Sequence, residues 1–177
     1  DLLRRGEPEK YKDKNWLLLR DVEFRCTFGF MVNNLMGLQW TPAYAHVNVF
    51  FNDESLGLYL LTESVRRNPD CRINVDKTGF VFEYDQYWWN KDLYVESSLD
   101  GEPLNYTFKY PKPEEMTTEQ LDYFKEMVDK MEQSINDGTY PEYIDMDSFT
   151  RWILARDLIG CWDGTGANYF LTKYDNT

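Results

Sequence analysis

One stretch in the second half of the chain constrains the fold most, because residues 117–138 carry a complete set of helix signals. Thr117 and Gln120 form the capping-box pattern that begins helices, and Gly138 suits a helix end. Apolar residues recur at helical spacing between them: Leu121, Phe124, Met127, Val128, Met131 and Ile135. A helix with one apolar face buries that face against another element. We therefore expect a core built on this helix, with the methionines as packing residues.

Short strand-like and helix-like segments make up most of the remaining sequence. The predicted strands are 16–19, 47–51, 56–61, 79–85, 93–95, 106–110 and 168–174, with turn residues at 52–55 and 100–103. Helical spacing also predicts a helix over 21–38, with Phe24, Phe28, Met31, Val32 and Leu35 on its apolar face, and another that begins at Asp147 and ends near Gly160. This order of elements predicts an α+β fold.

Composition narrows the classes of function. A chain of 177 residues with 42% hydrophobic and 17% aromatic residues can build one domain or two small lobes around a core. The net charge of −12 repels nucleic acid and suits a basic partner, cations or simple solubility. No apolar run reaches the roughly 18 residues that a membrane-spanning helix needs. The chain begins at Asp1 without a methionine, so we expect it to be an excerpt or a processed product.

Cysteine and histidine offer little for chemistry. Cys26, Cys71 and Cys161 cannot all pair with one another and form no CxxC motif, and His46 is the single histidine. A zinc site, a Cys-His pair and a Ser-His-Asp triad are therefore poorly supported. His46 lies in an apolar strand-like run, which is typical of a structural histidine.

The segment 157–171 carries the strongest chemical signal. Asp163 and Asn168 lie five positions apart between a helix-like and a strand-like segment. This order of an acid and then an amide is that of the catalytic loop of protein kinases, where the aspartate handles the substrate hydroxyl and the asparagine binds a metal ion. Gly164 and Gly166 would let the backbone approach a ligand closely. The spacing alone is a weak signal, because an aspartate and an asparagine five positions apart arise often by chance, and a plain connection between helix and strand explains it more readily.

A second acid nearby imitates the kinase motif more literally. The residues 155–158, Ala-Arg-Asp-Leu, resemble the kinase sequence His-Arg-Asp-Leu. However, the residue five positions after Asp157 is Trp162, which cannot bind magnesium. We therefore interpret Arg156 and Asp157 as a structural ion pair or a solvated helix face.

The chain resembles the CotH kinase family, which is named after spore coat protein H. The segments that carry the resemblance are 15–19, 24–25, 52–64, 79–85, 108–111, 144–145, 162–163 and 168–171. The most specific parts are the block around 52–64, in which Asp53 stands where the family usually has glycine, and the pair formed by Trp162-Asp163 and Asn168-Tyr169. In another departure, Cys26 follows Arg25 where the family has an Arg-Asn pair.

The resemblance implies an atypical protein-kinase-like fold in one domain over 1–177. Residues 1–65 would be the remnant of an N-lobe with its hinge, and 66–177 part of a mixed C-lobe with two main helices and short hairpins. The implied activity is transfer of the γ-phosphoryl group from ATP, with Mg²⁺ or Mn²⁺, to Ser or Thr. The implied substrate is a secreted or cell-surface protein of basic, serine-rich character, and the implied location is extracellular or in the cell envelope.

The resemblance also assigns residues. Asp163 matches the essential loop aspartate, as the catalytic or metal-orienting carboxylate, and Asn168 matches the asparagine that binds metal. The residues Glu63, Ser64 and Val65 match the hinge, whose backbone contacts the nucleotide. Glu63 fits a structural hydrogen bond or ion pair as well as it fits a nucleotide contact.

Two family elements are expected to lie outside this sequence. They are a phosphate-binding lysine upstream of Asp1 and a second metal-binding aspartate beyond Thr177; Asp175 is too close to Asn168 to replace it. We therefore expect the excerpt itself to be inactive.

Two other classes of function remain open. One is a surface adhesin or coat-assembly module that keeps the fold without catalysis. The other is a carbohydrate-binding protein that uses the aromatic residues Tyr87, Trp88, Trp89 and Tyr94. The sequence gives no prediction of the oligomeric state.

Overall fold

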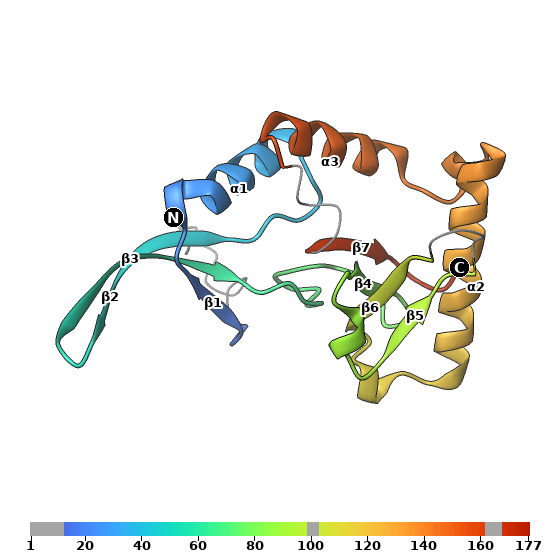
Figure 1. Cartoon of the computed structure of the whole chain (residues 1–177), viewed down its shortest axis with the longest axis horizontal. Helices are drawn as coiled ribbons and strands as arrows, with labels where there is room; N and C mark the ends of the chain where they lie inside the picture. Colours follow the sequence, from blue (N-terminus) through green and yellow to red (C-terminus); the bar gives the residue numbers. More distant parts are fainter. Residues whose placement is uncertain (1–12, 99–102, 162–167) are drawn as a thin grey trace. The chain divides into compact units, whose positions relative to one another are not determined.

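The chain forms two compact units, which are described separately. The structure is a computed structural model that describes residues 13–98, 103–161 and 168–177. The first unit spans Asp1–Asn74 and the second Val75–Thr177 (Figure 1). The expected turn at 100–103 lies mostly outside the described residues. Among the described helices, none is both long enough and apolar enough to cross a membrane.

The first unit contains a three-stranded antiparallel sheet of order β1-β3-β2. Its strands are β1 (Trp16–Leu19), β2 (Tyr44–Phe51) and β3 (Glu54–Glu63). The predicted hairpin is confirmed, since β2 and β3 are joined directly at Asn52 and Asp53 with φ of 47° and 65°. Two positive φ angles are what a tight hairpin turn requires, and Asn and Asp tolerate them better than other side chains do. Asp53 can therefore take the place of the family's glycine.

The helix of the first unit begins later than predicted. A 3-10 turn (Val22–Phe24) precedes α1 (Arg25–Met36), which ends at Gly37 with φ of 69°. Glu23 and Phe24 have positive φ, so the α-helix cannot extend back to Asp21. Asp21 instead reaches over this turn: its carboxylate accepts the backbone N–H groups of Cys26 and Thr27 at 2.8 and 3.1 Å.

The apolar residues whose spacing predicted this helix are largely exposed. Phe28 and Met31 are exposed, Leu35 is 84% exposed, and Val32 is the buried residue of this helix. A different side of α1 meets β2, through Phe30 against Tyr44 with ring centroids 5.4 Å apart. Periodicity could not separate these faces, because apolar residues occupy several sides of the helix.

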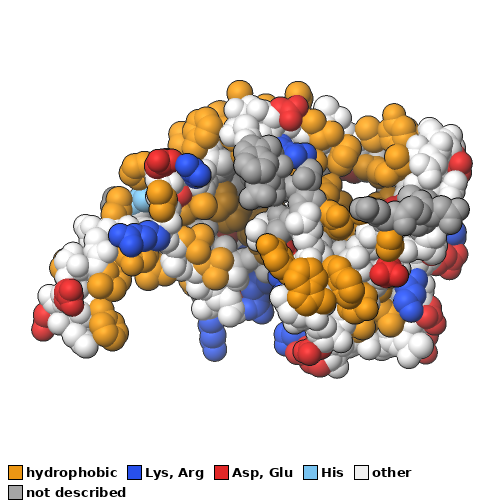
Figure 2. All heavy atoms as spheres, in the orientation of Figure 1, with side chains coloured by type: hydrophobic (Ala, Val, Ile, Leu, Met, Phe, Trp, Pro, Cys, Tyr) orange, Lys and Arg blue, Asp and Glu red, His pale blue; other side chains and the backbone are white. Residues whose placement is uncertain are grey.

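Exposed apolar side chains also occur on the strands of the first unit. Leu17 and Leu18 of β1 are exposed, and Phe51 of β2 is 66% exposed. Figure 2 shows hydrophobic side chains at the surface along the β2–β3 hairpin. Buried apolar side chains of this unit are few among the described residues, namely Val32, Leu60 and Ile73.

The second unit contains a four-stranded antiparallel sheet of order β5-β6-β4-β7. Its strands are β4 (Phe80–Tyr84), β5 (Tyr94–Glu96), β6 (Asn105–Tyr110) and β7 (Tyr169–Lys173). Short 3-10 turns lie at Trp88–Asn90, Pro113–Glu115 and Tyr140–Glu142. The strand β7, from the end of the chain, pairs along the whole of β4. This long-range pairing places the start of β7 beside the end of β4.

The helix α2 (Thr118–Asp137) packs on this sheet and confirms the prediction of a core built on it. The Thr117–Gln120 capping box and the Gly138 end are both present. Phe124 is 0% exposed, with rings of β4 and β6 around it. Those rings are Phe80, Phe82, Tyr106 and Phe108, with centroids 4.7 to 6.2 Å from that of Phe124. Ile135 departs from the prediction and is exposed.

The last helix, α3 (Met146–Leu158), is capped by a different residue than expected. Asp145 is the N-cap, and its Oδ1 accepts the N–H groups of Asp147 and Ser148. Asp147, the predicted cap, lies in the first turn and pairs with Arg151 at 2.8 Å. Trp152 of α3 stacks on Tyr169 of β7 with centroids 4.4 Å apart. This stacking holds α3 against the sheet at the residue that follows Asn168.

Candidate functional site

The amide residue of the predicted acid–amide pair lies at the start of β7. Asn168 directly precedes this strand, is exposed and has φ of 60°. This left-handed conformation is uncommon for side chains other than Asn and Asp. Asp163, with Gly164 and Gly166, lies outside the described residues. The structure therefore places one member of the pair.

A buried acid that the sequence analysis did not single out anchors Asn168. Glu83 on β4 is 6% exposed, and its Oε1 accepts the backbone N–H of Asn168 at 2.9 Å. Its Oε2 lies 3.1 Å from the Nζ of Lys109, on β6. The Lys109 ammonium also lies over the ring of Phe170, 5.5 Å from its centroid. Groups from three neighbouring strands thus fix the backbone at which the predicted loop ends.

Glu83 left a signal in the sequence that could have been used. It is the one charged residue of the apolar strand β4, and a buried carboxylate needs a paired charge or hydrogen-bond donors. Asp85, two residues on, is buried too, but it is bound differently. Its Oδ1 accepts the N–H of Tyr87 at 2.8 Å and its Oδ2 accepts the Thr107 hydroxyl at 3.1 Å. Glu83 therefore faces the predicted loop, whereas Asp85 holds the turn after β4.

The donor types at the start of β7 fit a hard cation that keeps part of its water shell. Mg²⁺ prefers oxygen ligands and is commonly held by one or two carboxylates besides water and phosphate. The amide oxygen of Asn168 is the suitable donor among the residues placed here, and Glu83 is already engaged by Lys109 and a backbone N–H. Over the described ranges, no cluster of three His, Cys, Asp or Glu side chains could hold a metal.

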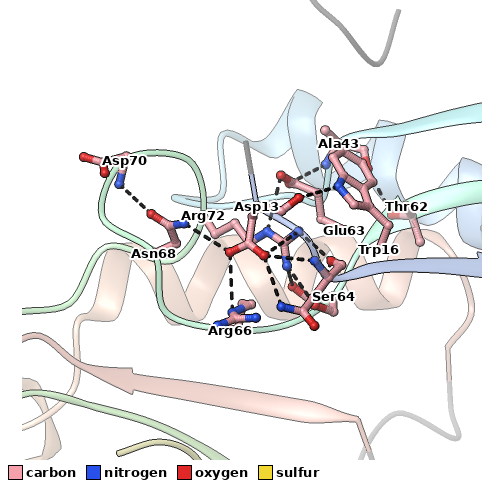
Figure 3. Close-up of polar contacts among 11 residues, drawn as sticks. Asp13, Trp16, Ala43, Thr62, Glu63, Ser64, Arg66, Asn68, Asp70 and Arg72 are labelled. Carbon is pink, nitrogen blue, oxygen red and sulfur yellow. Dashed lines mark hydrogen bonds and ion pairs between the residues drawn. The ribbon is translucent and has the colours of Figure 1, made fainter. Parts of the chain in front are cut away.

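The predicted hinge residues lie at the end of β3 in the first unit, and Glu63 has a structural environment. This side chain is 3% exposed, and its Oε2 accepts the backbone N–H of Ala43 at 2.9 Å (Figure 3). Its Oε1 lies 3.6 Å from the Nε of Arg72. Of the two roles that the sequence left open for Glu63, these contacts support the structural one.

Ser64 is held on both sides of its backbone. Its N–H donates to the carbonyl of Asn15 at 3.4 Å, and its own carbonyl accepts from Arg72 Nη1 at 3.0 Å. Its hydroxyl also bonds to Asn15 and Arg72. Val65 is half-buried, and no hydrogen bond joins it to another residue that the structure describes. If the backbone here contacts a nucleotide, Val65 is the residue of this segment whose backbone groups have no hydrogen-bond partner among the described residues.

Exposed aromatic rings gather between the end of β4 and the start of β5. Tyr87, Trp89 and Tyr94 are exposed, and Trp88 links them, with its ring centroid 4.5 Å from that of Tyr94 and 6.2 Å from that of Trp89. The planes are strongly inclined, at 46° and 82°, so the rings form no continuous flat platform. This cluster is the observation behind the carbohydrate-binding alternative.

Among the described residues, the cysteine and histidine side chains do not come together in a second candidate site. The three cysteines are free. His46 is exposed on β2, with its Nε2 3.1 Å from the Thr27 hydroxyl. A cavity of about 450 Å³ beside His46 has mainly apolar walls, including Val22, Phe24 and Leu58. It contains none of the predicted site residues.

Comparison with known proteins shows the family to which this chain belongs. Searches of curated proteins and of solved structures found no match. A family model described as "CotH kinase protein" matches residues 28–177, which include β2, β3, the whole second unit and every predicted site residue. The chain belongs to the CotH kinase protein family.

Proposed function

We propose that this protein is an atypical protein kinase that transfers the γ-phosphoryl group of ATP to a Ser or Thr hydroxyl of a protein substrate. Family membership supports a kinase-like function. The observation that carries the proposal is the anchored position of Asn168, whose backbone is bound by buried Glu83 immediately before β7. A metal ligand must be held in a fixed geometry by its surroundings, and this anchor supplies such support.

In this proposal each residue has a distinct role. The Asn168 amide oxygen and the Asp163 carboxylate would hold Mg²⁺ or Mn²⁺, and Asp163 would orient the attacking hydroxyl and accept its proton. The metal would offset the charge that develops while the γ-phosphoryl group passes from ATP to that hydroxyl. Glu83 is a positioning residue: it touches neither substrate nor metal and acts through the backbone of Asn168.

The first unit would bind the nucleotide. The β2–β3 hairpin leads directly into Glu63–Val65, and α1 contacts β2 through Phe30 and Tyr44. This is the arrangement expected of a kinase N-lobe by analogy with the family. Within the predicted hinge, the contact with adenine is assigned to Val65, because the Ser64 backbone is already bound on both sides.

The substrate is proposed to be a basic, serine-rich protein outside the cell or in its envelope. The net charge of −12 supports a basic partner, since opposite charges accelerate encounter. A non-catalytic adhesin or coat-assembly module would need the same acidic surface to bind a basic partner, but it would not transfer a phosphoryl group. An assay of phosphoryl transfer therefore decides between a kinase and a binding module.

The test compares two aspartates in the natural protein that carries this chain. Asp163→Asn should lower transfer of radiolabelled phosphate from ATP to a basic serine-rich peptide by about 10²–10⁴-fold, the usual contribution of a positioned acid or base. Asp157→Asn, on the exposed face of α3, is the matched control and should keep wild-type activity. Wild-type activity in Asp163→Asn would contradict the site, and the absence of transfer by the wild type would favour the binding module.

A further inference from the structure

A buried arginine lies directly behind the residues assigned to the nucleotide. The side chain of Arg72 is 0% exposed, on the loop that follows β3. Its Nη1 donates to the carbonyl and the hydroxyl of Ser64, at 3.0 and 2.7 Å (Figure 3). Its Nη2 donates to the carbonyl of Asn15 at 2.6 Å. One guanidinium therefore ties this loop to the end of β3 and to the residue before β1.

Two acids and an aromatic ring complete the environment of Arg72. The carboxylates of Glu63 and Asp13 lie 3.6 and 3.7 Å from its nitrogens, and the guanidinium lies over the ring of Trp16, 5.7 Å from its centroid. Trp16 in turn donates its indole N–H to the carbonyl of Asp13 at 2.7 Å. Planar, multidentate contacts of this kind need arginine, because a lysine ammonium cannot reproduce the fork.

Asp13 is held in its charged form by the same cluster. Burial raises the pKa of this carboxyl, but hydrogen bonds from Asn15 and Asn68 and the charges of Arg72 and Arg66 outweigh burial, so its pKa lies below the usual value of 3.8. Asp13 therefore stays ionised at neutral pH.

We propose that Arg72 is a positioning residue that sets the direction of the Val65 N–H for the nucleotide base. The Ser64 carbonyl and the Val65 N–H belong to one peptide group. A trans peptide group points its carbonyl and its N–H in opposite directions. Because Arg72 holds the carbonyl, the N–H of Val65 points away from the guanidinium and is fixed as a donor. The inference rests on the proposed kinase function.

This arrangement makes Arg72 a determinant of base recognition rather than of phosphate binding. The purine base of ATP has nitrogen atoms that can accept a hydrogen bond from a backbone N–H. Tripolyphosphate has no base, so its binding does not depend on the Val65 N–H. Loss of the guanidinium fork would let the peptide group rotate and would remove the preorganised donor. Affinity for ATP should then fall, while affinity for tripolyphosphate should not.

The experiment measures both affinities by calorimetry, with Mg²⁺, in the natural protein that carries this chain. Arg72→Lys keeps the charge and removes the fork, and we expect up to about a tenfold loss of affinity for ATP, the upper end of the range for one neutral hydrogen bond such as that from the Val65 N–H. Tripolyphosphate affinity should be unchanged. Arg66→Lys is the matched control, because Arg66 is on the same loop and pairs with Asp13, but its side chain is 39% exposed.

A second variant covers the case in which Arg72→Lys does not fold. Ser64→Ala removes one of the two Arg72 contacts on that residue and leaves the carbonyl contact, so we expect a smaller loss in the same direction. A folded Arg72→Lys or Ser64→Ala protein with wild-type affinity for ATP would overturn the role of Arg72 alone. Equal losses of affinity for ATP and for tripolyphosphate would also overturn the role of Arg72. If the wild type binds neither ligand, or binds tripolyphosphate more tightly than ATP, the proposed function is contradicted. This inference is then contradicted too, because it rests on that function.

Discussion

Buried carboxylates recur in this protein, and each joins separate parts of its unit. Glu83 joins β4 to β6 and to the start of β7, and Glu63 joins β3 to Ala43 before β2 and to Arg72 on the loop after β3. Glu132 on α2 is 2% exposed and accepts the Tyr106 hydroxyl of β6 at 2.7 Å. A buried acid is costly unless it is paired, so such residues fix one arrangement of their elements more than they add stability.

The pair formed by Tyr106 and Glu132 gives a prediction for stability. The second carboxylate oxygen of Glu132 has no hydrogen-bond partner among the described residues, so Tyr106→Phe would leave the buried acid without its hydroxyl donor. Burial, followed by the bond and the charge of Glu132, raises the pKa of Tyr106, which therefore stays protonated as that donor. We expect the free energy of unfolding, from urea denaturation, to fall by about 1–3 kcal/mol.

Tyr123→Phe is the control for this prediction. The Tyr123 ring stacks on Phe80 with centroids 6.0 Å apart, and no described residue bonds to its hydroxyl. Loss of the Tyr123 hydroxyl should change the free energy of unfolding by less than about 0.5 kcal/mol. Equal effects of the two substitutions would show that the Glu132 bond contributes nothing specific.

At the scale of single elements, α1 depends on Asp21 for its first turn. Burial raises the pKa of Asp21, but the Thr27 hydroxyl and the N–H groups of Cys26 and Thr27 outweigh it, so the pKa lies below the usual 3.8. A carboxylate whose pKa is lowered by folding stabilises the folded state above its unfolded pKa. That contribution is lost as the pH falls through the folded pKa.

Asp21→Asn should therefore lower the urea midpoint near neutral pH, and the difference from wild type should shrink below about pH 4. Circular dichroism at several pH values would measure it. Asp70→Asn, at an exposed carboxylate of the same unit, serves as the control and should shift the midpoint little. A difference from wild type that grows as the pH falls would contradict the role assigned to Asp21.

The two longest predicted helices show what the sequence can and cannot establish. For α2, the Thr117 cap, the apolar spacing and the Gly138 end agree, and all three are present. For α1, the spacing was correct but the start was not, and the spacing did not identify the covered face. Positive φ at Glu23 and Phe24 has no sequence signature, and the side of α1 that meets β2 is set by tertiary packing.

The site was predictable in part for similar reasons. Asn168 before a strand could be identified from its neighbours in sequence, whereas its anchor Glu83 comes from a strand 85 residues earlier. The polar cluster at Arg72 likewise joins residues 57 positions apart in the bond to Asn15. Single-sequence patterns report local spacing, so contacts made by sheet pairing and loop return lie beyond them.

At the scale of the whole molecule, the buried apolar residues are distributed unequally. The cluster of Phe80, Phe82, Val95, Tyr106, Phe108, Phe124 and Val128 lies entirely in the second unit. The first unit is tied by the Arg72 cluster and by sheet hydrogen bonds, with few buried apolar side chains among its described residues. Since local stability follows burial, the second unit should open less often than the first.

Hydrogen exchange with mass spectrometry tests this difference. In the wild type, we expect the slowest exchange in β4, β6 and α2, which surround Phe124. Phe124→Ala should destabilise the second unit by about 3–5 kcal/mol, because truncating a buried ring loses its burial and leaves a cavity. Exchange should then accelerate in those three elements and stay unchanged in β2 and β3, which belong to the other unit.

Phe51→Ala, at an exposed ring, is the control and should leave exchange in the second unit as it is. Equal acceleration in both units by Phe124→Ala would mean that they unfold as one cooperative body, and protection of the first unit would then have to come from the core of the second.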